Sequence, residues 1–202
     1  MEKFYLEIPS LERKEEIVNY INEFVNYNSD LNGMGPLDKI LEGYSIEEAI
    51  DMCLKVSDYD FAKSINRCQS KTFLLIREND NKIIGSINVR WNISLKKLEF
   101  GGHIGYGIRP TERNKGYNKI NLYLGLVEAN NLNLDRIKVS CYHDNIASDK
   151  TIKSLGGVLE KSEIDPYDGM LTNCYWINVK ESIEKYKDVY DKYIFINNNK
   201  SR

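Results

Sequence analysis

The residues from Arg109 to Lys119 combine positive charge with a glycine where a predicted strand passes into a predicted helix. Arg113, Lys115 and Lys119 place three cations within seven residues, and Arg109 brings the segment to four cations against one glutamate. A helix N-terminus carries about half a positive charge, and a turn of successive N–H groups forms a concave anion site. We therefore expect this turn to bind one small anion, and a pyrophosphate fits its size.

The segment from Arg113 to Asn118 reads Arg, two residues, Gly, one residue, Asn, and it resembles the coenzyme A binding motif of the GNAT superfamily of acetyltransferases. The preceding segment from Tyr106 to Pro110 is similar to the strand that leads into that motif. Asp144 to Ser148 and Leu155 to Gly157 resemble the start and the end of the family's next helix. The resemblance covers roughly residues 4–179.

The resemblance implies an α/β (α+β) fold, with a mixed, mostly antiparallel central sheet flanked by helices on both faces. It also implies acetyl-CoA as the acyl donor, bound where two central strands part. Backbone contacts with the pantetheine arm and the acetyl carbonyl then fall to Tyr106, Gly107 and Ile108. The other implied cofactor-binding residues are Arg113, Asn114, Lys115, Gly116, Tyr117, Asn118 and Lys119 at the pyrophosphate, and Asn145 on the neighbouring helix. Glycines at 105 and 107 are expected to leave room for a ligand against the strand.

Two positions depart from the family pattern. Asn118 stands where the family prefers glycine or alanine, and asparagine tolerates unusual backbone angles, so we expect binding to be retained. Ile152 lies seven residues after Asn145, where many members place a tyrosine that protonates the departing thiolate. Isoleucine cannot act as an acid, so either another group does this work or the thiolate leaves unassisted.

Three residues are candidates for catalysis. His103 is expected in the strand before the turn, on the same face as Gly105 and Gly107, where an imidazole suits a base near neutral pH. The alternative for His103 is a structural histidine satisfied by hydrogen bonds. Glu99 either acts through water or is a solvated carboxylate at a strand edge. Tyr175 either replaces the missing acid or is a packed aromatic side chain.

Composition narrows the classes of function. The chain has 202 residues, with 28 basic and 30 acidic residues and a net charge of −2, which argues against a nucleic-acid partner. Apolar runs are far shorter than the ~20 residues that span a bilayer, and the N-terminus lacks a signal-peptide pattern, so we expect no membrane partner and a cytoplasmic location. The four cysteines show no metal-ligand or disulfide spacing, so we expect reduced thiols and no metal.

Hydrophobic periodicity predicts the elements that position these residues. Strands are expected at 4–8, 72–77, 82–90, 98–108, 136–142, 158–159 and 172–179. The strands at 72–77 and 82–90 are expected to form an antiparallel hairpin. Helices are expected from residue 10 to 25, from a capping box at Ser45 to Val56, and at 116–130 and 146–155. Residues 28–43 are expected to form a surface loop. The first helix is expected to bury Ile17, Val18, Ile21, Phe24 and Val25.

The predicted organisation is one acetyltransferase domain over residues 1–180, whose segment 28–70 shapes the acceptor side. Residues 181–202 form a helix followed by a tail that is expected to be disordered from residue 197. That helix either packs on its own domain or forms a homodimer contact. Asp30, Asp38 and Glu42 either favour a cationic acceptor or are simply solvated.

The predicted reaction is transfer of an acetyl group to a primary amine of a small molecule or peptide, by direct attack on the thioester. The alternative function is a coenzyme A binding sensor or partner module with weak or no turnover, which the isoleucine at position 152 would favour.

Overall fold

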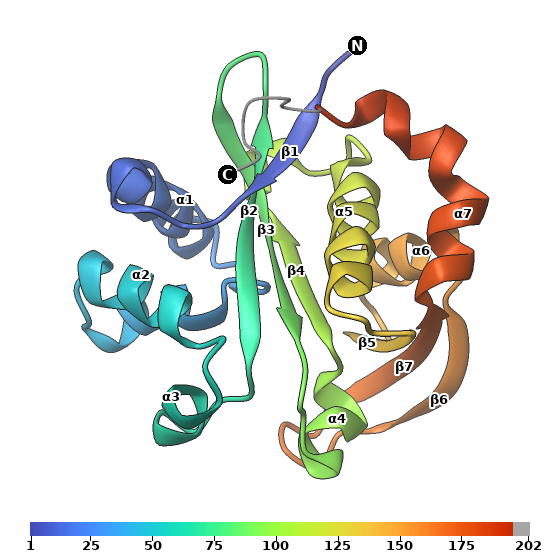
Figure 1. Ribbon diagram of the computed structural model, residues 1–202. Coiled ribbons are helices and arrows are strands. Elements are labelled where there is room, and N and C mark those ends of the chain that lie inside the picture. The colour runs from blue at the N-terminus through green and yellow to red at the C-terminus, as the bar shows by residue number, and fades with distance from the viewer. Residues whose placement is uncertain (196–202) are drawn as a thin grey trace.

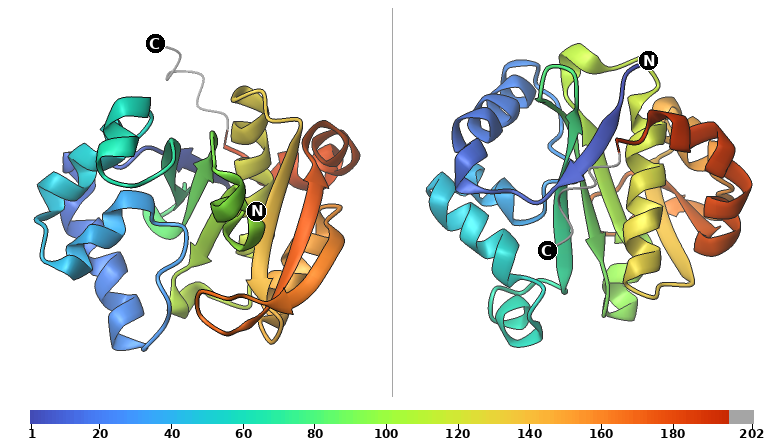
Figure 2. Two further views of the ribbon diagram at one scale, coloured as in Figure 1. Left: turned by 90° about the horizontal axis from the view of Figure 1, so that it is seen from below. Right: turned by 45° about the horizontal axis from the view of Figure 1, so that its top comes forward.

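A computed structural model describes residues 1–195, apart from the side chains of residues 95 and 97. The described residues form a seven-stranded sheet, in which neighbouring strands follow the order β1-β2-β3-β4-β5-β7-β6. In Figure 1, α1, α2 and α3 cover one face of the sheet and α5, α6 and α7 cover the other, and Figure 2 shows the same layers from two further sides. The predicted mixed sheet between two layers of helices is confirmed.

The strands are β1 (Phe4–Glu7), β2 (Ser70–Arg77), β3 (Lys82–Arg90), β4 (Ile104–Ile108), β5 (Arg136–Tyr142), β6 (Val158–Ile164) and β7 (Leu171–Asn178). The α-helices are α1 (Lys14–Asn26), α2 (Ile46–Lys55), α3 (Tyr59–Ser64), α4 (Leu95–Gly101), α5 (Tyr117–Asn131), α6 (Ile146–Ser154) and α7 (Val179–Tyr190). Short 3₁₀ helices are η1 (Leu11–Arg13), η2 (Gly35–Glu42), η3 (Pro110–Glu112) and η4 (Asp191–Tyr193).

The sheet is antiparallel except where β4 meets β5. These two parallel strands share a single residue pair, Ile104 with Val139, and they part beyond it. A gap therefore opens in the middle of the sheet, next to the second half of β4. We refer to the space beside residues 105–108 of β4, on the side of β5, as the strand gap.

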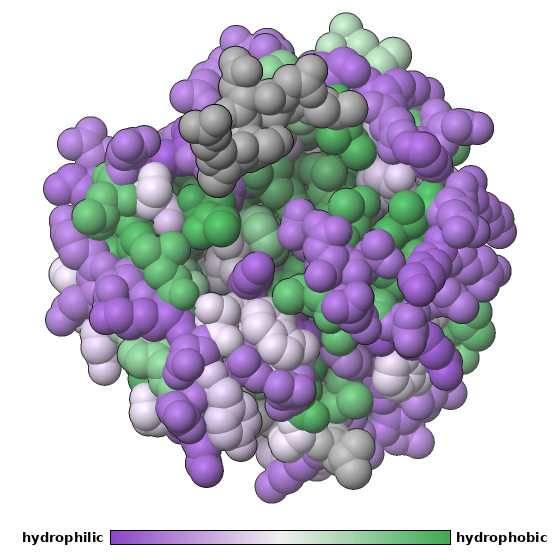
Figure 3. Space-filling view, in the orientation of Figure 1, coloured by the Kyte–Doolittle hydropathy of each residue, from purple (hydrophilic) through white to green (hydrophobic). Residues whose placement is uncertain are grey.

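Two hydrophobic cores hold the layers together. One core joins the sheet to α5, α6 and α7, and the other joins it to α1, α2 and η2. Figure 3 shows that hydrophobic side chains also reach the surface over α1 and α2. Val25 is 55% exposed, so the prediction that it is buried was wrong, and Tyr20 lies in the core instead.

Local signals in the sequence are confirmed at several element boundaries. The hydroxyl of Ser45 accepts from the N–H of Glu48, whose carboxylate accepts from the N–H of Ser45, which completes the predicted capping box of α2. The β2–β3 hairpin forms as predicted. At the C-terminal end, α7 packs on its own domain, where Tyr123 stacks on Tyr190 with ring centroids 4.9 Å apart. The predicted disordered residues, 197–202, lie outside the described residues.

The predicted strand at 98–108 was wrong in its first half. Residues Leu95–Gly101 form α4, and β4 begins only at Ile104. The pair Gly101-Gly102 ends the helix, since glycine readily adopts the backbone conformation that follows a helix C-terminus. His103 therefore precedes β4, and Glu99 lies on a helix.

The prediction of a surface loop at 28–43 was also wrong. Met34 and Leu37 are buried in the core under α1 and α2, and residues 35–42 form η2. Pro36 fits the first turn of such a helix because its missing N–H would have no partner there. Helix α3, capped by the carboxylate of Asp58, was not predicted.

Candidate active site

The backbone of β4 presents two residues to the strand gap. The N–H of Arg90 donates to His103 O and the N–H of Arg109 donates to Ile84 O, so these two pairs are hydrogen-bonded positions of the ladder between β3 and β4. In an antiparallel ladder such pairs alternate with pairs whose polar groups point outward. By this alternation, the N–H groups of Tyr106 and Ile108 face the gap, whereas the polar groups of Gly107 face β3.

The space over the two glycines of β4 is filled by the chain itself. A Cβ on Gly107 would lie 2.8 Å from Asn32 O, and a Cβ on Gly33 would lie 2.5 Å from the Cα of Tyr106. The expectation that these glycines leave room for a ligand was therefore wrong on this face. Their missing side chains admit residues 32–33, which close the sheet on the side of α1 and α2.

The turn between β4 and α5 has the conformation of an anion cradle. Asn114 and Gly116 have φ values of +64° and +82°, and no side chain caps the N-terminus of α5. A Cβ added to Gly116 would meet no heavy atom within 4 Å, so the turn is open there. A backbone of this kind directs successive N–H groups to one side, which suits a phosphate.

The cations of the turn are less free than the sequence implied. Arg113 donates from Nε to Ile108 O over 3.0 Å and from Nη2 to Ser29 Oγ over 2.7 Å. Lys115 donates to Glu112 over 2.8 Å. Lys119 is exposed, and no ion pair to it is found within residues 1–195. Lys119 is therefore the side chain best placed to meet an incoming anion.

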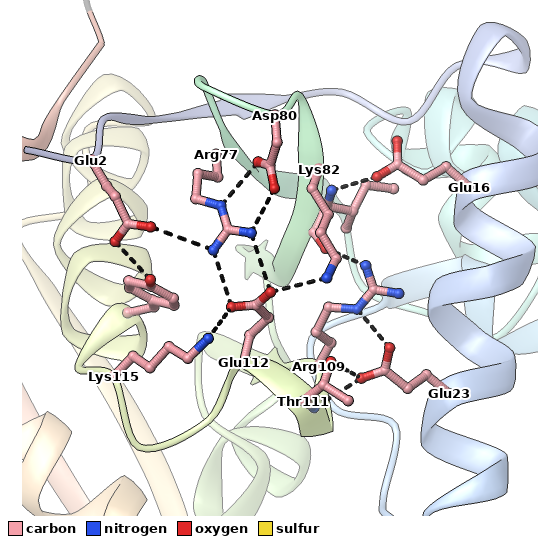
Figure 4. A network of polar contacts seen from close by, with 12 residues as sticks. Glu2, Glu16, Glu23, Arg77, Asp80, Lys82, Arg109, Thr111, Glu112 and Lys115 are labelled. Carbon is pink, nitrogen blue, oxygen red and sulfur yellow. Dashed lines mark hydrogen bonds and ion pairs between the residues drawn. The ribbon is translucent and has the colours of Figure 1, made fainter.

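The buried carboxylate of Glu112 anchors the turn to the sheet (Figure 4). The Glu112 side chain is 6% exposed and accepts from Arg77, Lys82 and Lys115 at 2.8 to 3.2 Å. Burial alone would raise the pKa of Glu112, but bonds from Lys115, Lys82 and Arg77 outweigh it and lower the pKa to about 2. Glu112 thus ties the turn to β2 and β3 as a permanent anion.

A second ion pair holds the other side of the turn. Arg109 is 6% exposed and donates from Nε to Glu23 over 2.9 Å. The N–H and the hydroxyl of Thr111 also donate to Glu23, at 2.9 and 2.8 Å. Arg109 therefore links the turn to α1 and does not add to a cationic surface, contrary to its count among the cations of this segment.

Two residues of the predicted pyrophosphate site point their side chains inward. The Tyr117 ring packs on Phe4 with centroids 4.9 Å apart, and its hydroxyl donates to Glu2 over 2.7 Å. Only its backbone N–H remains for a ligand. Asn118 is an ordinary helical residue, and the unusual backbone angle expected there falls on Asn114 instead. The Oδ1 of Asn118 is buried without a hydrogen-bond partner.

A hydroxyl pair crosses from β4 to α6, and the sequence analysis did not identify it. The hydroxyl of Tyr106 lies 2.8 Å from Oγ of Ser148 in the first turn of α6. Burial raises the pKa of the Tyr106 hydroxyl, so this group stays protonated at neutral pH. Burial also raises the pKa of nearby Cys141 to about 11, so this thiol is neutral too.

Tyr175 lies on β7 beside the same helix. Its side chain is buried, and its hydroxyl donates to Asp149, the residue next to Ser148. Burial and the bond to Asp149 raise the pKa of Tyr175. The two pairs, Tyr106 with Ser148 and Tyr175 with Asp149, therefore meet the first turn of α6 side by side.

His103 and Glu99 lie at the other end of β4, by α4. Nδ1 of His103 accepts the N–H of Lys138 over 2.9 Å, which leaves the ring proton on Nε2. Burial, followed by the charges of Arg90 and Lys138, lowers the pKa of His103 to about 4. The Glu99 side chain is 55% exposed and pairs with Lys161 at 3.1 Å. The structure does not bring these two residues to the hydroxyls at α6.

Asn145 caps α6, since its Oδ1 accepts the N–H of Ser148 over 3.0 Å. This bond leaves its side-chain NH₂ group available to a ligand. Within the described part of the chain, no group of three or more histidine, cysteine, aspartate or glutamate side chains is placed to hold a metal ion. No helix there is both long enough and apolar enough to cross a membrane.

A strand gap beside an open turn with the conformation of an anion site is the arrangement that the resemblance implied. The comparisons with known proteins show which family the chain belongs to. The model of the acetyltransferase (GNAT) domain matches residues 37–158. The chain belongs to this family of acetyltransferase domains. A search of curated proteins gave no significant match.

Solved structures resemble the chain in fold. The ribosomal-protein-S5-alanine acetyltransferase of Vibrio fischeri is 18% identical, with a TM-score of 0.61 over 88% of this chain and 94% of its own. The microcin C7 self-immunity acetyltransferase, solved with acetyl-CoA and AMP, is 18% identical, with a TM-score of 0.57 over 86% and 91%. The spermidine/spermine N-acetyltransferase of Vibrio cholerae is 13% identical, with a TM-score of 0.58 over 91% and 99%.

Proposed function

We propose that this chain transfers an acetyl group from acetyl-CoA to a primary amine of a small molecule or a peptide. One observation carries the proposal: the N–H groups of Tyr106 and Ile108 face a strand gap that leads to the open turn at Asn114 and Gly116. An amide-bearing arm can pair with the exposed edge of β4 while a pyrophosphate meets the turn and Lys119.

The residues present fit the donor. The turn supplies backbone N–H groups and the open side of Gly116, and Lys119 adds an exposed positive charge. Asn145 adds a free NH₂ group at the start of α6. Since the turn before α5 and the start of α6 hold the donor on their side of the sheet, the amine is expected to reach the gap from the other side, past residues 32–33 and α1 (Figure 1).

The reaction joins the amine nitrogen to the acetyl carbon and breaks the bond from that carbon to sulfur. The amine loses one proton and the departing sulfur gains one. We assign the proton donor for sulfur to the hydroxyl pair of Tyr106 and Ser148, because it is protonated, partly buried and next to the gap. Tyr175 remains a second candidate donor, held by Asp149.

Replacing Tyr106 by phenylalanine removes this hydroxyl with little change in shape. We expect kcat to fall about a hundredfold, as general acid catalysis contributes on that scale, whereas binding of acetyl-CoA should stay the same. Tyr142→Phe is the matched control, because Tyr142 is a partly exposed tyrosine that bonds Asp168. Steady-state release of thiol measures both variants. Equal kcat for Tyr106→Phe and wild type would exclude the assignment.

The pH dependence of kcat/KM tests whether His103 acts as the base. His103, with its pKa lowered to about 4, is neutral at every pH above about 5 and so produces no step between pH 6 and 8. We expect kcat/KM to rise with pH along the ionisation of the acceptor amine, tenfold per pH unit below the pKa of that amine. Rates with two amines of different pKa test this. A step near pH 6.5, the same for both amines, would instead show a histidine base.

Turnover itself is tested by thiol release from acetyl-CoA with a panel of primary amines, and by mass detection of the acetylated product. Acetylated product with at least one amine class supports the proposal. Tight binding of acetyl-CoA without product from any amine would instead identify a coenzyme A binding sensor or partner module.

A further inference from the structure

Arg90, at the end of β3, carries a guanidinium without a partner. Its Nε is fully buried and makes no hydrogen bond, and the side chain forms no ion pair within the described residues. Burial lowers the pKa of Arg90, and the charge of Arg67 adds to this effect. The residue as a whole is half-buried, with Nε out of reach of water. An unpaired charge that is partly withdrawn from water is costly, so such groups are normally paired.

Other side chains in the same row of β3 are satisfied. Oγ of Ser86 donates to Asn32 O over 3.2 Å, and Nδ2 of Asn88 donates to Oγ1 of Thr72 over 3.0 Å. Alternation along a strand places Ser86, Asn88 and Arg90 on one face. Arg90 is thus the exception in a row of polar groups that otherwise find partners inside the protein.

The guanidinium lies over the base of the strand gap. A Cβ on Gly105 would meet Nη2 of Arg90 at 2.8 Å, so the missing side chain leaves this space to the guanidinium. Gly105 follows Ile104, the residue at which β4 and β5 begin to part. Gly33 of the segment under α1 and α2 lies on the same face. Arg90 is therefore on the acceptor side, opposite the turn before α5.

Two acids of the 28–43 segment are already paired with other cations. Asp38 is bonded to Arg67 at 2.6 Å, and Glu42 is bonded to Lys39 at 2.7 Å. These pairs also neutralise two of the acids that could have favoured a cationic acceptor. What the site lacks is an anion.

We propose that Arg90 binds a carboxylate of the acceptor, so that the acceptor is an amine that also carries a carboxylate, such as an amino acid or a peptide with a free acidic group. The planar fork of a guanidinium matches a carboxylate in geometry and charge. This inference rests on the proposed acetyl transfer and adds the acceptor class to it.

The stability of the free protein gives a first test that needs no substrate. Arg90→Met removes a charge that has no partner and keeps most of the side-chain volume. We expect the Tm to rise by about 2–4 °C, because replacing unpaired buried charge by apolar groups is stabilising. The control Arg67→Met breaks the pair with Asp38 and should not raise the Tm. A lower Tm for Arg90→Met would show a structural role and overturn the proposal.

The acceptor class is tested with matched pairs of amines, each a free carboxylate and its carboxamide. Wild type should prefer the carboxylate by about tenfold or more in kcat/KM, as expected for a hydrogen-bonded charge. Arg90→Gln should lose this preference, and Arg67→Gln should keep it. Equal rates for both members of each pair in wild type would overturn the proposal.

The proposed function can fail separately from this inference. If acetyl-CoA binds but no amine is acetylated, calorimetry with the same carboxylate and carboxamide pairs replaces the rates, and equal affinities overturn the role of Arg90. If acetyl-CoA does not bind, the proposed function fails. The Tm of Arg90→Met then tests Arg90 alone: a raised Tm supports an unpaired charge at this position, and a lowered Tm overturns the proposal.

Discussion

Replacing Glu112 by glutamine should lower the Tm of the protein by about 10 °C and weaken the binding of acetyl-CoA. The side chain is 6% exposed and is the common partner of Arg77, Lys82 and Lys115. Removing one partner of a buried ion pair costs about 3–5 kcal/mol, because the remaining charges are left uncompensated. For a chain of this size, each kcal/mol lowers the Tm by about 2–4 °C.

The control for this variant is Glu2→Gln. Glu2 belongs to the same network, bonding Tyr117 and lying 3.5 Å from Arg77, but its side chain is 43% exposed. Pairs with an exposed partner contribute about 0–1 kcal/mol, so its Tm should change by a few degrees at most. Similar Tm values for the two variants, from calorimetric scans, would contradict the role of Glu112 as anchor.

The same carboxylate sets an acid limit to stability. The pKa of Glu112 falls from an ordinary value of 4.5 to about 2 in the folded protein. A lowered pKa stabilises the fold at pH values above 4.5, and this contribution is lost as the pH falls through about 2. Glu112→Gln should therefore show a shallower loss of stability than wild type between pH 4.5 and 2.

Gly33→Ala should destabilise the protein by about 2–5 kcal/mol. Gly33 has a φ of +79°, and a Cβ would lie 2.5 Å from the Cα of Tyr106 and 2.9 Å from the carbonyl oxygens of Gly105 and Ser86. The left-handed conformation costs about 1–2 kcal/mol for alanine, and overpacking adds about 1–3 kcal/mol.

Gly43→Ala provides the matched control. Its φ is +93°, but a Cβ there meets nothing within 4 Å, so only the conformational cost of about 1–2 kcal/mol applies. Denaturant unfolding measures both variants. Because Gly33 presses on β4 next to the gap, Gly33→Ala should also change the KM for the amine, and Gly43→Ala should not. Equal free energies of unfolding would mean that residues 32–33 pack loosely on β4.

Local signals in the sequence predicted much of the fold. The capping box at Ser45, the β2–β3 hairpin and the passage from β4 into α5 each depend on residues within a few positions of one another. The glycine turn at Gly116 was predicted for the same reason. Such features follow from backbone propensity and hydrogen bonds that the neighbouring residues provide themselves.

Long-range pairing could not be predicted in the same way. His103 was expected in β4, but the preceding residues form α4, because a segment this short carries too little hydrophobic periodicity to separate a helix from a strand. The glycines at 105 and 107 were expected to face a ligand, yet Gly107 faces Asn32, 75 positions earlier in the chain, and Gly105 faces the guanidinium of Arg90 and Gly33. The hydroxyl pair of Tyr106 and Ser148 depends on how α6 packs against β4.

The charge of the turn also depends on long-range contacts that the sequence does not predict. Arg109 and Lys115 were counted as part of a positive cluster, but Glu23 and Glu112 pair with them. Only the fold shows that Lys119 keeps its charge exposed.

The most direct test is calorimetric titration of acetyl-CoA into wild type, Lys119→Ala and Lys180→Ala. Lys180 lies on α7 with its side chain 71% exposed, so it controls for the loss of a surface charge. We predict one site per chain for wild type, a Kd raised about tenfold by Lys119→Ala as expected for a hydrogen bond to a charged group, and no change for Lys180→Ala. No binding to wild type, or equal affinities for all three proteins, would contradict acetyl-CoA binding at the turn before α5.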